Sequence, residues 1–112
     1  MAVQQVPGLT RTDLQQHDLD IPGREVIQNR VDIAPEAPAI RHWHPGEEII
    51  YVLEGSLEYE IDGQPPLRVN ACGALMVRAE TVHAVRNVGD GNAAELATYV
   101  VEKDKPLLNL PD

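Results

Sequence analysis

Apolar and polar residues alternate in short runs along most of this chain. In the segment SLEYEI, Leu57, Tyr59 and Ile61 face one way and the two glutamates face the other. Side chains of a β-strand point to opposite faces with a period of two, so this alternation indicates a half-buried strand.

Further short runs of Val, Ile, Leu and Tyr are separated by Gly, Pro, Asn and Asp. They are REVIQNRVDI, EIIYVL, LRVN, ALMVR, HAVRNV and ELATYVVE. Asp62-Gly63 is a typical hairpin turn. No segment between residues 25 and 102 keeps a helical period over ten or more residues. Many short strands at regular spacing predict an all-β barrel or sandwich.

The first 24 residues differ from the rest. They are polar and interrupted by Pro7, Gly8, Pro22 and Gly23. We expect residues 1–24 to form a short irregular arm, with TRTDLQQHDL either a helical turn or a strap on a neighbour. Residues 25–112 then form one barrel domain, since 112 residues suffice for a single core.

Charge and composition narrow the classes of partner. The chain has 9 Lys and Arg against 18 Asp and Glu, a formal charge of −9. Phosphate repels such a protein, so we expect neither nucleic acid nor a membrane as a partner. We see no secretion signal and no apolar stretch of about 20 residues. Cys72 is the single cysteine, which excludes an intramolecular disulfide and suits a cytoplasmic protein.

The segment RHWHPGEE concentrates metal-binding side chains. On a strand His42 and His44 project to the same face. Pro45-Gly46 bends the chain, so Glu48 can swing back toward both imidazoles. Two imidazoles and one carboxylate suit a divalent first-row metal and leave open positions on it.

His83 opens a later strand and completes a three-His, one-Glu set if that strand lies beside the first two segments. A lone histidine in a β-protein is more often a surface or hydrogen-bonded residue than a ligand. The combination of His-x-His, a spaced Glu and a later His favours a metal. Glu47 is interpreted as solvated, and His17 as part of the polar arm.

These residues carry a resemblance. HWHPGEEIIYVLEG resembles the first motif of the cupin family, and HAVRN resembles the end of its second motif. The likeness spans about residues 25–102 and is similar to small bacterial single-domain cupins. The matching positions are His42, His44, Glu48, Gly55, His83 and Asn87.

The resemblance implies a double-stranded β-helix, or jelly roll, with a metal inside the barrel. It implies that His42, His44, Glu48 and His83 are the ligands. Small cupins are usually dimers, so we expect a homodimer. The arm and the tail PLLNL would cover sheet edges, across a two-fold axis or on their own subunit.

The chain departs from the family pattern at turn positions. Glu36, Cys72, Arg78 and Glu80 stand where the family has Gly or Pro. Gly and Pro set backbone geometry. The family pattern therefore does not predict the path of VRAETVH or the approach of His83 to the metal. Arg78 and Glu80 either pair across this loop or are both solvated.

The predicted barrel lining is apolar and comprises Ile50, Val52, Leu57, Ile61, Val85 and Met76. Tyr59 is the one weak candidate for handling a proton, and it also suits the core. Such a pocket favours a small hydrophobic substrate that binds the metal through oxygen.

A metal-dependent dioxygenase or oxidoreductase is therefore the preferred function. The alternatives are a non-catalytic metal or small-molecule binding protein and a metal-dependent isomerase or decarboxylase, because the fold does not choose the reaction. Iron or manganese is favoured, while zinc, nickel, copper and cobalt also suit these ligands.

Overall fold

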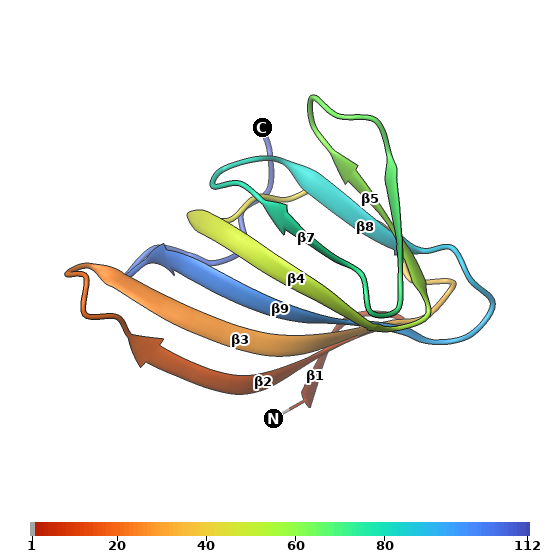
Figure 1. The fold of residues 1–112 in the computed structure, drawn as a ribbon, viewed down its shortest axis with the longest axis horizontal. Helices are drawn as coiled ribbons and strands as arrows, with labels where there is room; N and C mark the ends of the chain where they lie inside the picture. Colours follow the sequence, from red (N-terminus) through yellow and green to blue (C-terminus); the bar gives the residue numbers. More distant parts are fainter. Residues whose placement is uncertain (1) are drawn as a thin grey trace.

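The computed structural model describes residues 2–112. These residues form nine strands and no helix (Figure 1). The strands are β1 (Ala2–Val6), β2 (Leu9–Asp18), β3 (Arg24–Ile33), β4 (Gly46–Glu54), β5 (Ser56–Ile61), β6 (Leu67–Asn70), β7 (Ala74–Val77), β8 (His83–Asn87) and β9 (Ala93–Glu102). The all-β prediction is confirmed. No helix in residues 2–112 has the length and apolarity that a membrane crossing requires.

The strands form two antiparallel sheets. The larger sheet has the order β1-β2-β3-β9-β4-β7, and the smaller has the order β6-β5-β8. The main hydrophobic core draws on both sheets, with Ile33, Ile50 and Val52 from the larger sheet and Leu57 and Tyr59 from the smaller. The candidate site therefore lies on strands that are held by a shared core.

The period-two pattern locates the strands well. β5 begins and ends where SLEYEI does, and Leu57, Tyr59 and Ile61 are its buried positions. β4 buries its even-numbered residues from Gly46 to Val52. The hairpin at Asp62-Gly63 joins the paired strands β5 and β6, and Gly63 has φ +85°.

One predicted core residue is wrong. Met76 is 44% exposed, and its register partner on β4 is Ile49, which is also exposed. Since Glu48 and Ile50 are the buried neighbours of Ile49, this register places Met76 on the outer face. Val77, one residue further, is the buried position.

The expectation of an irregular N-terminal arm is also wrong. Residues 2–18 hold β1 and β2, and β2 pairs with β3 from Leu9↔Ile33 to Asp18↔Glu25. β2 is mostly exposed and lacks an apolar alternation. Backbone pairing with β3 and side-chain hydrogen bonds such as Gln15 to Gln28 hold it in the sheet.

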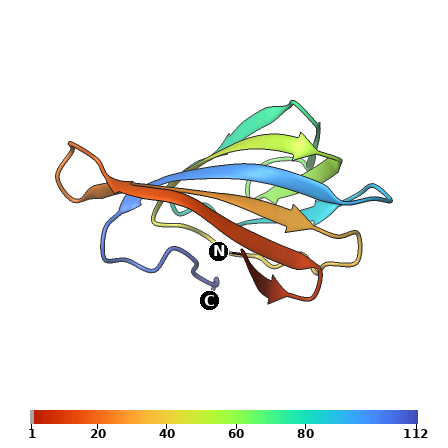
Figure 2. The ribbon, with the colours of Figure 1, turned by 90° about the horizontal axis from the view of Figure 1, so that it is seen from below.

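The C-terminal tail folds back on its own chain. Beyond β9 it turns under the larger sheet (Figure 2). Asn109 and Trp43 exchange two backbone hydrogen bonds, of 2.9 and 3.0 Å. The tail therefore covers the extended segment that carries the two neighbouring histidines.

Candidate metal site

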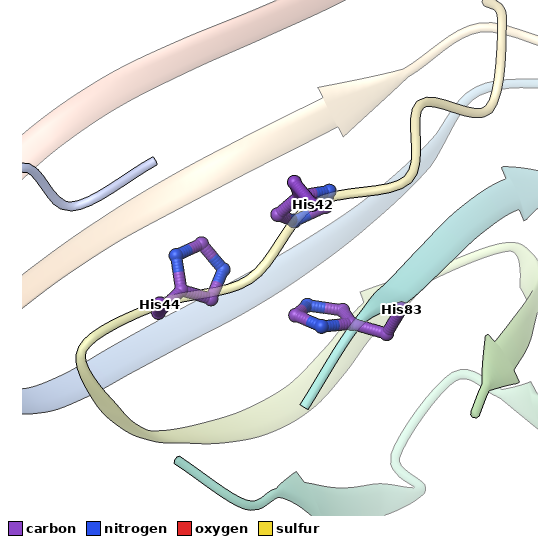
Figure 3. Close-up of side chains that lie close together, drawn as sticks. All are labelled: His42, His44 and His83. Atoms are coloured by element: carbon purple, nitrogen blue, oxygen red, sulfur yellow. The ribbon is translucent and has the colours of Figure 1, made fainter. Parts of the chain in front are cut away.

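The site forms where two distant segments pair through their backbones. His42 donates to the His83 carbonyl oxygen at 3.0 Å, and His83 donates to the His42 carbonyl oxygen at 2.9 Å. The sequence suggested that His42 lies on a strand, but it lies in an extended segment that makes only an isolated bridge. His83 opens β8, as predicted. Reciprocal antiparallel pairing brings the two imidazoles together, and Figure 3 shows the rings of His42, His44 and His83 close to one another.

His44 and Glu48 enter the same space from either side of a tight bend. Their side chains are 4% and 3% exposed. Gly46, between them, has its Cα against the β9 backbone, where a Cβ would overlap the Val100 carbonyl oxygen. The Tyr99 ring packs edge-on against His44, with centroids 4.7 Å apart. Close contact with β9 thus fixes the approach of both side chains.

The four candidate ligands converge. One ring nitrogen from each of His42, His44 and His83 lies within 4.8 Å of the others. Glu48 Oε1 lies 3.3 Å from His44 Nε2 and 3.1 Å from His83 Nε2. His17, by contrast, is exposed on β2, and Glu47 lies outside this cluster.

Backbone carbonyls orient all three rings. The Nδ1 atoms of His42, His44 and His83 lie 2.7, 2.7 and 2.9 Å from the carbonyl oxygens of Ile40, Leu107 and Thr81. A carbonyl oxygen only accepts, so each Nδ1 carries a hydrogen. Each neutral ring then presents an Nε2 lone pair to the common space, an arrangement typical of imidazole ligands.

The charge states also suit a cation. Burial lowers the pKa of His42 to about 4, which keeps the ring neutral. Burial opposes ionisation of Glu48, but the neighbouring His44 and His83 rings lower the pKa of its carboxyl to about 2. Burial also opposes the charge on His83, but Glu48 raises its pKa. A proton on His83 therefore competes with a metal for the same space.

One buried atom tests directly whether the cluster fits a metal. His44 Nε2 is buried and has no hydrogen-bond partner among the residues that the structure describes. An unpartnered buried acceptor costs about 1–3 kcal/mol. It lies 3.3 Å from a carboxylate oxygen, which is another acceptor. A divalent cation between such atoms would satisfy both, so the donor set fits a metal.

The loop before His83 keeps the turn geometry despite its unusual residues. Glu80, in this loop, has φ 61°, and Cys72, in the turn between β6 and β7, has φ 74°. Both lie in the left-handed region that glycine adopts most easily. The Glu80 backbone N–H donates to the His44 carbonyl oxygen at 2.9 Å. Arg78 and Glu80 are both exposed and form no ion pair with each other in the described chain. The turn thus reaches the geometry that presents His83, at the cost of backbone strain.

Replacing Glu80 with glycine should stabilise the protein. The left-handed conformation costs a non-glycine residue about 1–2 kcal/mol, and glycine's extra unfolded-state freedom offsets part of the gain. We expect a gain of about 0.5–1 kcal/mol by urea denaturation. Glu36→Gly, at a position without positive φ, should instead destabilise. A Glu80→Gly variant that is less stable than the parent would contradict this account of the loop.

A cavity of about 180 Å³ adjoins the cluster. The three histidines and Glu48 line it together with apolar side chains, among them Ile50, Val85, Leu107 and Leu108. The apolar lining was predicted for Ile50 and Val85, whereas the contribution of the C-terminal tail was not. A cavity with this lining suits a small molecule with an apolar body and a few polar atoms.

Sequence reasoning missed a buried carboxyl in this cavity. Glu95 on β9 is 4% exposed, and the Tyr59 hydroxyl donates to its Oε1 at 2.6 Å. Burial, then the charge of Glu48, raises the pKa of Glu95 to about 8, although the Tyr59 hydrogen bond opposes this. Tyr99 and Val101 place the odd-numbered positions at the end of β9 on its inward face. This alternation was the signal in the sequence that Glu95 also points inward.

The raised pKa of Glu95 predicts a pH dependence of stability. The folded state binds a proton here between pH 4.5 and about 8 that the unfolded state releases. The contribution of Glu95 to the stability of the metal-free protein should therefore be greatest below pH 4.5. It should fall as the pH rises through about 8. Glu95→Gln should remove this contribution. Urea midpoints at several pH values test it, and an unchanged pH slope in the variant would refute it.

Comparison with known proteins gives a consistent picture. The family model described as "Cupin domain" matches residues 29–101. A curated relative, "Polyketide synthase CurC" from Streptomyces cyaneus, is 46% identical over 54 residues. That stretch covers 46% of this chain and 34% of the relative, so the chain spans about a third of its length.

Solved structures share the fold. KdgF from Halomonas sp. has a TM-score of 0.72 at 19% identity, covering 93% of this chain and 89% of that one. A recombinant oxalate oxidase in complex with glycolate has a TM-score of 0.74 at 26% identity, covering 95% of this chain and 57% of that one. The jelly-roll prediction is confirmed by these neighbours.

Proposed function

We propose, from the premise that this chain belongs to the cupin family, that it is a metal-dependent enzyme. His42, His44, His83 and Glu48 would hold a divalent first-row metal at the base of the apolar cavity. The observation that carries this proposal is the buried, unpartnered Nε2 of His44 beside the Glu48 carboxylate. Iron or manganese is the preferred ion, and zinc, nickel, copper or cobalt would suit the same ligands.

The proposed substrate is a small hydrophobic compound that binds through oxygen. When bound, the metal would polarise that oxygen and, if redox-active, support oxidation. The chain's own residues would bind the apolar body of the substrate and exclude water through Ile50, Val85 and Leu107. The local likeness to a polyketide synthase suggests a substrate rich in carbonyl groups. Dioxygenase or oxidoreductase chemistry is the first reaction class we propose.

A second candidate is a proton-transfer reaction, such as an isomerase or decarboxylase carries out. The buried Tyr59–Glu95 pair favours it, because these reactions need an acid or base beside the substrate. A non-catalytic metal or small-molecule binding protein is the remaining alternative. It would use the same four ligands but leave any bound molecule unchanged.

The test begins with untagged protein purified without added metal. Elemental mass spectrometry should find about one divalent ion per chain, as a single mononuclear site requires. The His42→Ala/His44→Ala variant should contain almost none. Reconstitution with Fe(II) or Mn(II) should then permit binding of maltol, a small compound that chelates through adjacent oxygens. A folded protein that takes up no metal would overturn the proposal, and a loaded protein that excludes maltol would overturn an open coordination site.

Oxygen consumption separates the reaction classes. An oxygen electrode should record uptake by the Fe(II)-loaded protein with enolisable, oxygen-chelating compounds if it is a dioxygenase or oxidoreductase. Substrate conversion without oxygen uptake would instead support the isomerase or decarboxylase. The absence of both oxygen uptake and substrate conversion across such a panel would support the non-catalytic binding protein.

We further propose a homodimer, supported by an apolar outer face. Ile49, Tyr51, Leu53 and Met76 are 36–48% exposed on β4 and its partner β7. Light scattering over a dilution series should show a dimer that Ile49→Asp disrupts. Ile21→Asp, at an exposed residue outside these strands, should not disrupt it. A monomer at every concentration would exclude the dimer.

The single cysteine, Cys72, is the basis for proposing a cytoplasmic location.

A further inference from the structure

We propose that Glu95 is the catalytic acid–base residue of this cavity and that Tyr59 positions it. The substrates would then be carbonyl compounds with an acidic C–H bond next to the carbonyl carbon. This inference rests on the proposed function, because it needs the carbonyl oxygen of the substrate to face the histidine cluster. It assigns the proton-handling group that the sequence did not reveal.

The geometry of the pair is well defined. Glu95 lies on β9 of the larger sheet and Tyr59 on β5 of the smaller, and their 2.6 Å hydrogen bond bridges the two sheets inside the barrel. Both residues line the same cavity as the histidines. Of the two carboxyl oxygens of Glu95, only Oε1 has a hydrogen-bond partner among the described residues. The other carboxyl oxygen is therefore available to a bound molecule.

Burial makes a purely structural role expensive. A carboxyl that is 4% exposed loses its hydration, and a single neutral donor compensates only part of that loss. Glutamine has the same shape and would accept the same hydrogen bond from Tyr59 but cannot release a proton. A glutamate at this place, in a cavity that also holds a metal-binding cluster, therefore points to a chemical role.

The strand registers place Tyr59 beside the cluster and Glu95 further along the same cavity. His83 pairs with Ile61, and Tyr59 pairs with Val85, so Tyr59 and His83 are diagonal neighbours on one face. Such neighbours are about 7–8 Å apart. Glu48 and Glu95 lie on the inward faces of the adjacent strands β4 and β9, where Glu95 pairs with Val52, four residues along β4 from Glu48. Both line the same cavity, so a substrate with its oxygen at the histidines extends along the cavity toward Tyr59 and Glu95.

The proposed step is a proton transfer without an oxidant. The carboxylate of Glu95 removes a proton from the carbon next to the carbonyl. The C–H electron pair forms the C=C bond of an enolate, and the carbonyl π pair moves to oxygen, which takes the negative charge. Glu95 then returns the proton to the same carbon, which yields exchange. Where that carbon bears a hydroxyl, the hydroxyl proton moves to the former carbonyl oxygen and Glu95 returns its proton to the former carbonyl carbon, which yields isomerisation. The Tyr59 hydroxyl keeps its proton and holds Oε1, so that the other oxygen reaches the substrate.

The test uses 2-hydroxyacetophenone, a small aromatic probe with two adjacent oxygens and an acidic CH₂ group. Protein loaded with Zn(II), which has no redox chemistry, is incubated with the probe in D₂O. NMR then follows loss of the CH₂ proton signal. We expect the parent protein to accelerate exchange, and Glu95→Gln to lose about 100-fold or more of that acceleration, the usual range for a general acid or base. Glu60→Gln, an exposed glutamate of β5, is the matched control.

Tyr59→Phe separates positioning from structure. The Tyr59 hydrogen bond favours the ionised form of Glu95, so its loss should shift the midpoint of the exchange profile to higher pH. Tyr51→Phe, an exposed tyrosine, should leave the profile unchanged. The other ionisable groups lining this cavity are Glu48, Tyr99, Arg11 and the three histidines. They are the same in both variants, so a shift specific to Tyr59→Phe reports on Glu95.

Metal content and thermal stability are measured on every sample. A parent protein without metal would refute the proposed function, whereas a fully loaded parent that exchanges no probe protons would refute only the role of Glu95. A loaded, folded Glu95→Gln variant that exchanges as fast as the parent would also overturn it. Loss of exchange in Glu95→Gln with metal retained, together with the pH shift in Tyr59→Phe, would establish it.

Discussion

Replacing His44 with alanine should weaken Zn(II) binding by more than about 100-fold, because losing even the outer partner of a metal ligand costs 10–100-fold. The ring is 4% exposed, its Nδ1 is fixed by the Leu107 carbonyl oxygen, and its Nε2 has no hydrogen-bond partner within the described part of the chain. Isothermal titration calorimetry of the metal-free protein with Zn(II) measures the effect directly.

His17→Ala is the matched control for this prediction. His17 is exposed on β2, where its Nε2 lies 3.1 Å from Gln15 Oε1. The control should bind Zn(II) as tightly as the parent protein. Equal affinity in the parent and in His44→Ala would mean that the histidine cluster does not hold the metal.

Gly46→Ala should destabilise the protein by about 3 kcal/mol, the upper part of the range for overpacking. A Cβ at this position would overlap the Val100 carbonyl oxygen and approach Val101 Cα to 2.7 Å. Both contacts are backbone atoms of β9, so relief requires β4 and β9 to separate. The variant should also bind metal more weakly, because Gly46 lies midway between His44 and Glu48. Thermal denaturation followed by circular dichroism measures the loss.

Gly91→Ala provides the comparison for this substitution. A Cβ at Gly91 meets nothing within 4 Å, so stability should change by no more than about 0.5 kcal/mol. If Gly46→Ala were as stable as Gly91→Ala, the close approach of β4 to β9 would be wrong.

The sequence predicts most of the barrel because period-two burial and turn residues are local signals. SLEYEI and the Asp62-Gly63 turn predict β5 and its hairpin with β6 without any knowledge of the tertiary structure. β2 carries no such signal, since it is a mostly exposed strand held by backbone pairing and polar side chains. A polar strand of this kind cannot be distinguished from an irregular arm by hydropathy.

The candidate ligands are readable from the sequence because they fall at fixed spacing around HWHPGEE, with His83 at the head of a later strand. The groups that orient them are not. Leu107 contributes a backbone carbonyl oxygen, which leaves no trace in residue identity. Glu95 was overlooked because a carboxylate in a strand ordinarily faces water, although it shares the buried face of β9 with Tyr99 and Val101.

The central claim is that three imidazoles and one carboxylate hold a single metal ion. X-ray absorption spectroscopy of the protein loaded with Mn(II) or Zn(II) tests it most directly, because imidazole rings give a characteristic multiple-scattering pattern. The account predicts about three imidazole ligands with carboxylate oxygen beside them, as in other His-rich mononuclear sites. It also predicts that this pattern disappears in His42→Ala/His44→Ala. A metal surrounded by oxygen alone, or a spectrum unchanged in that variant, would contradict the account.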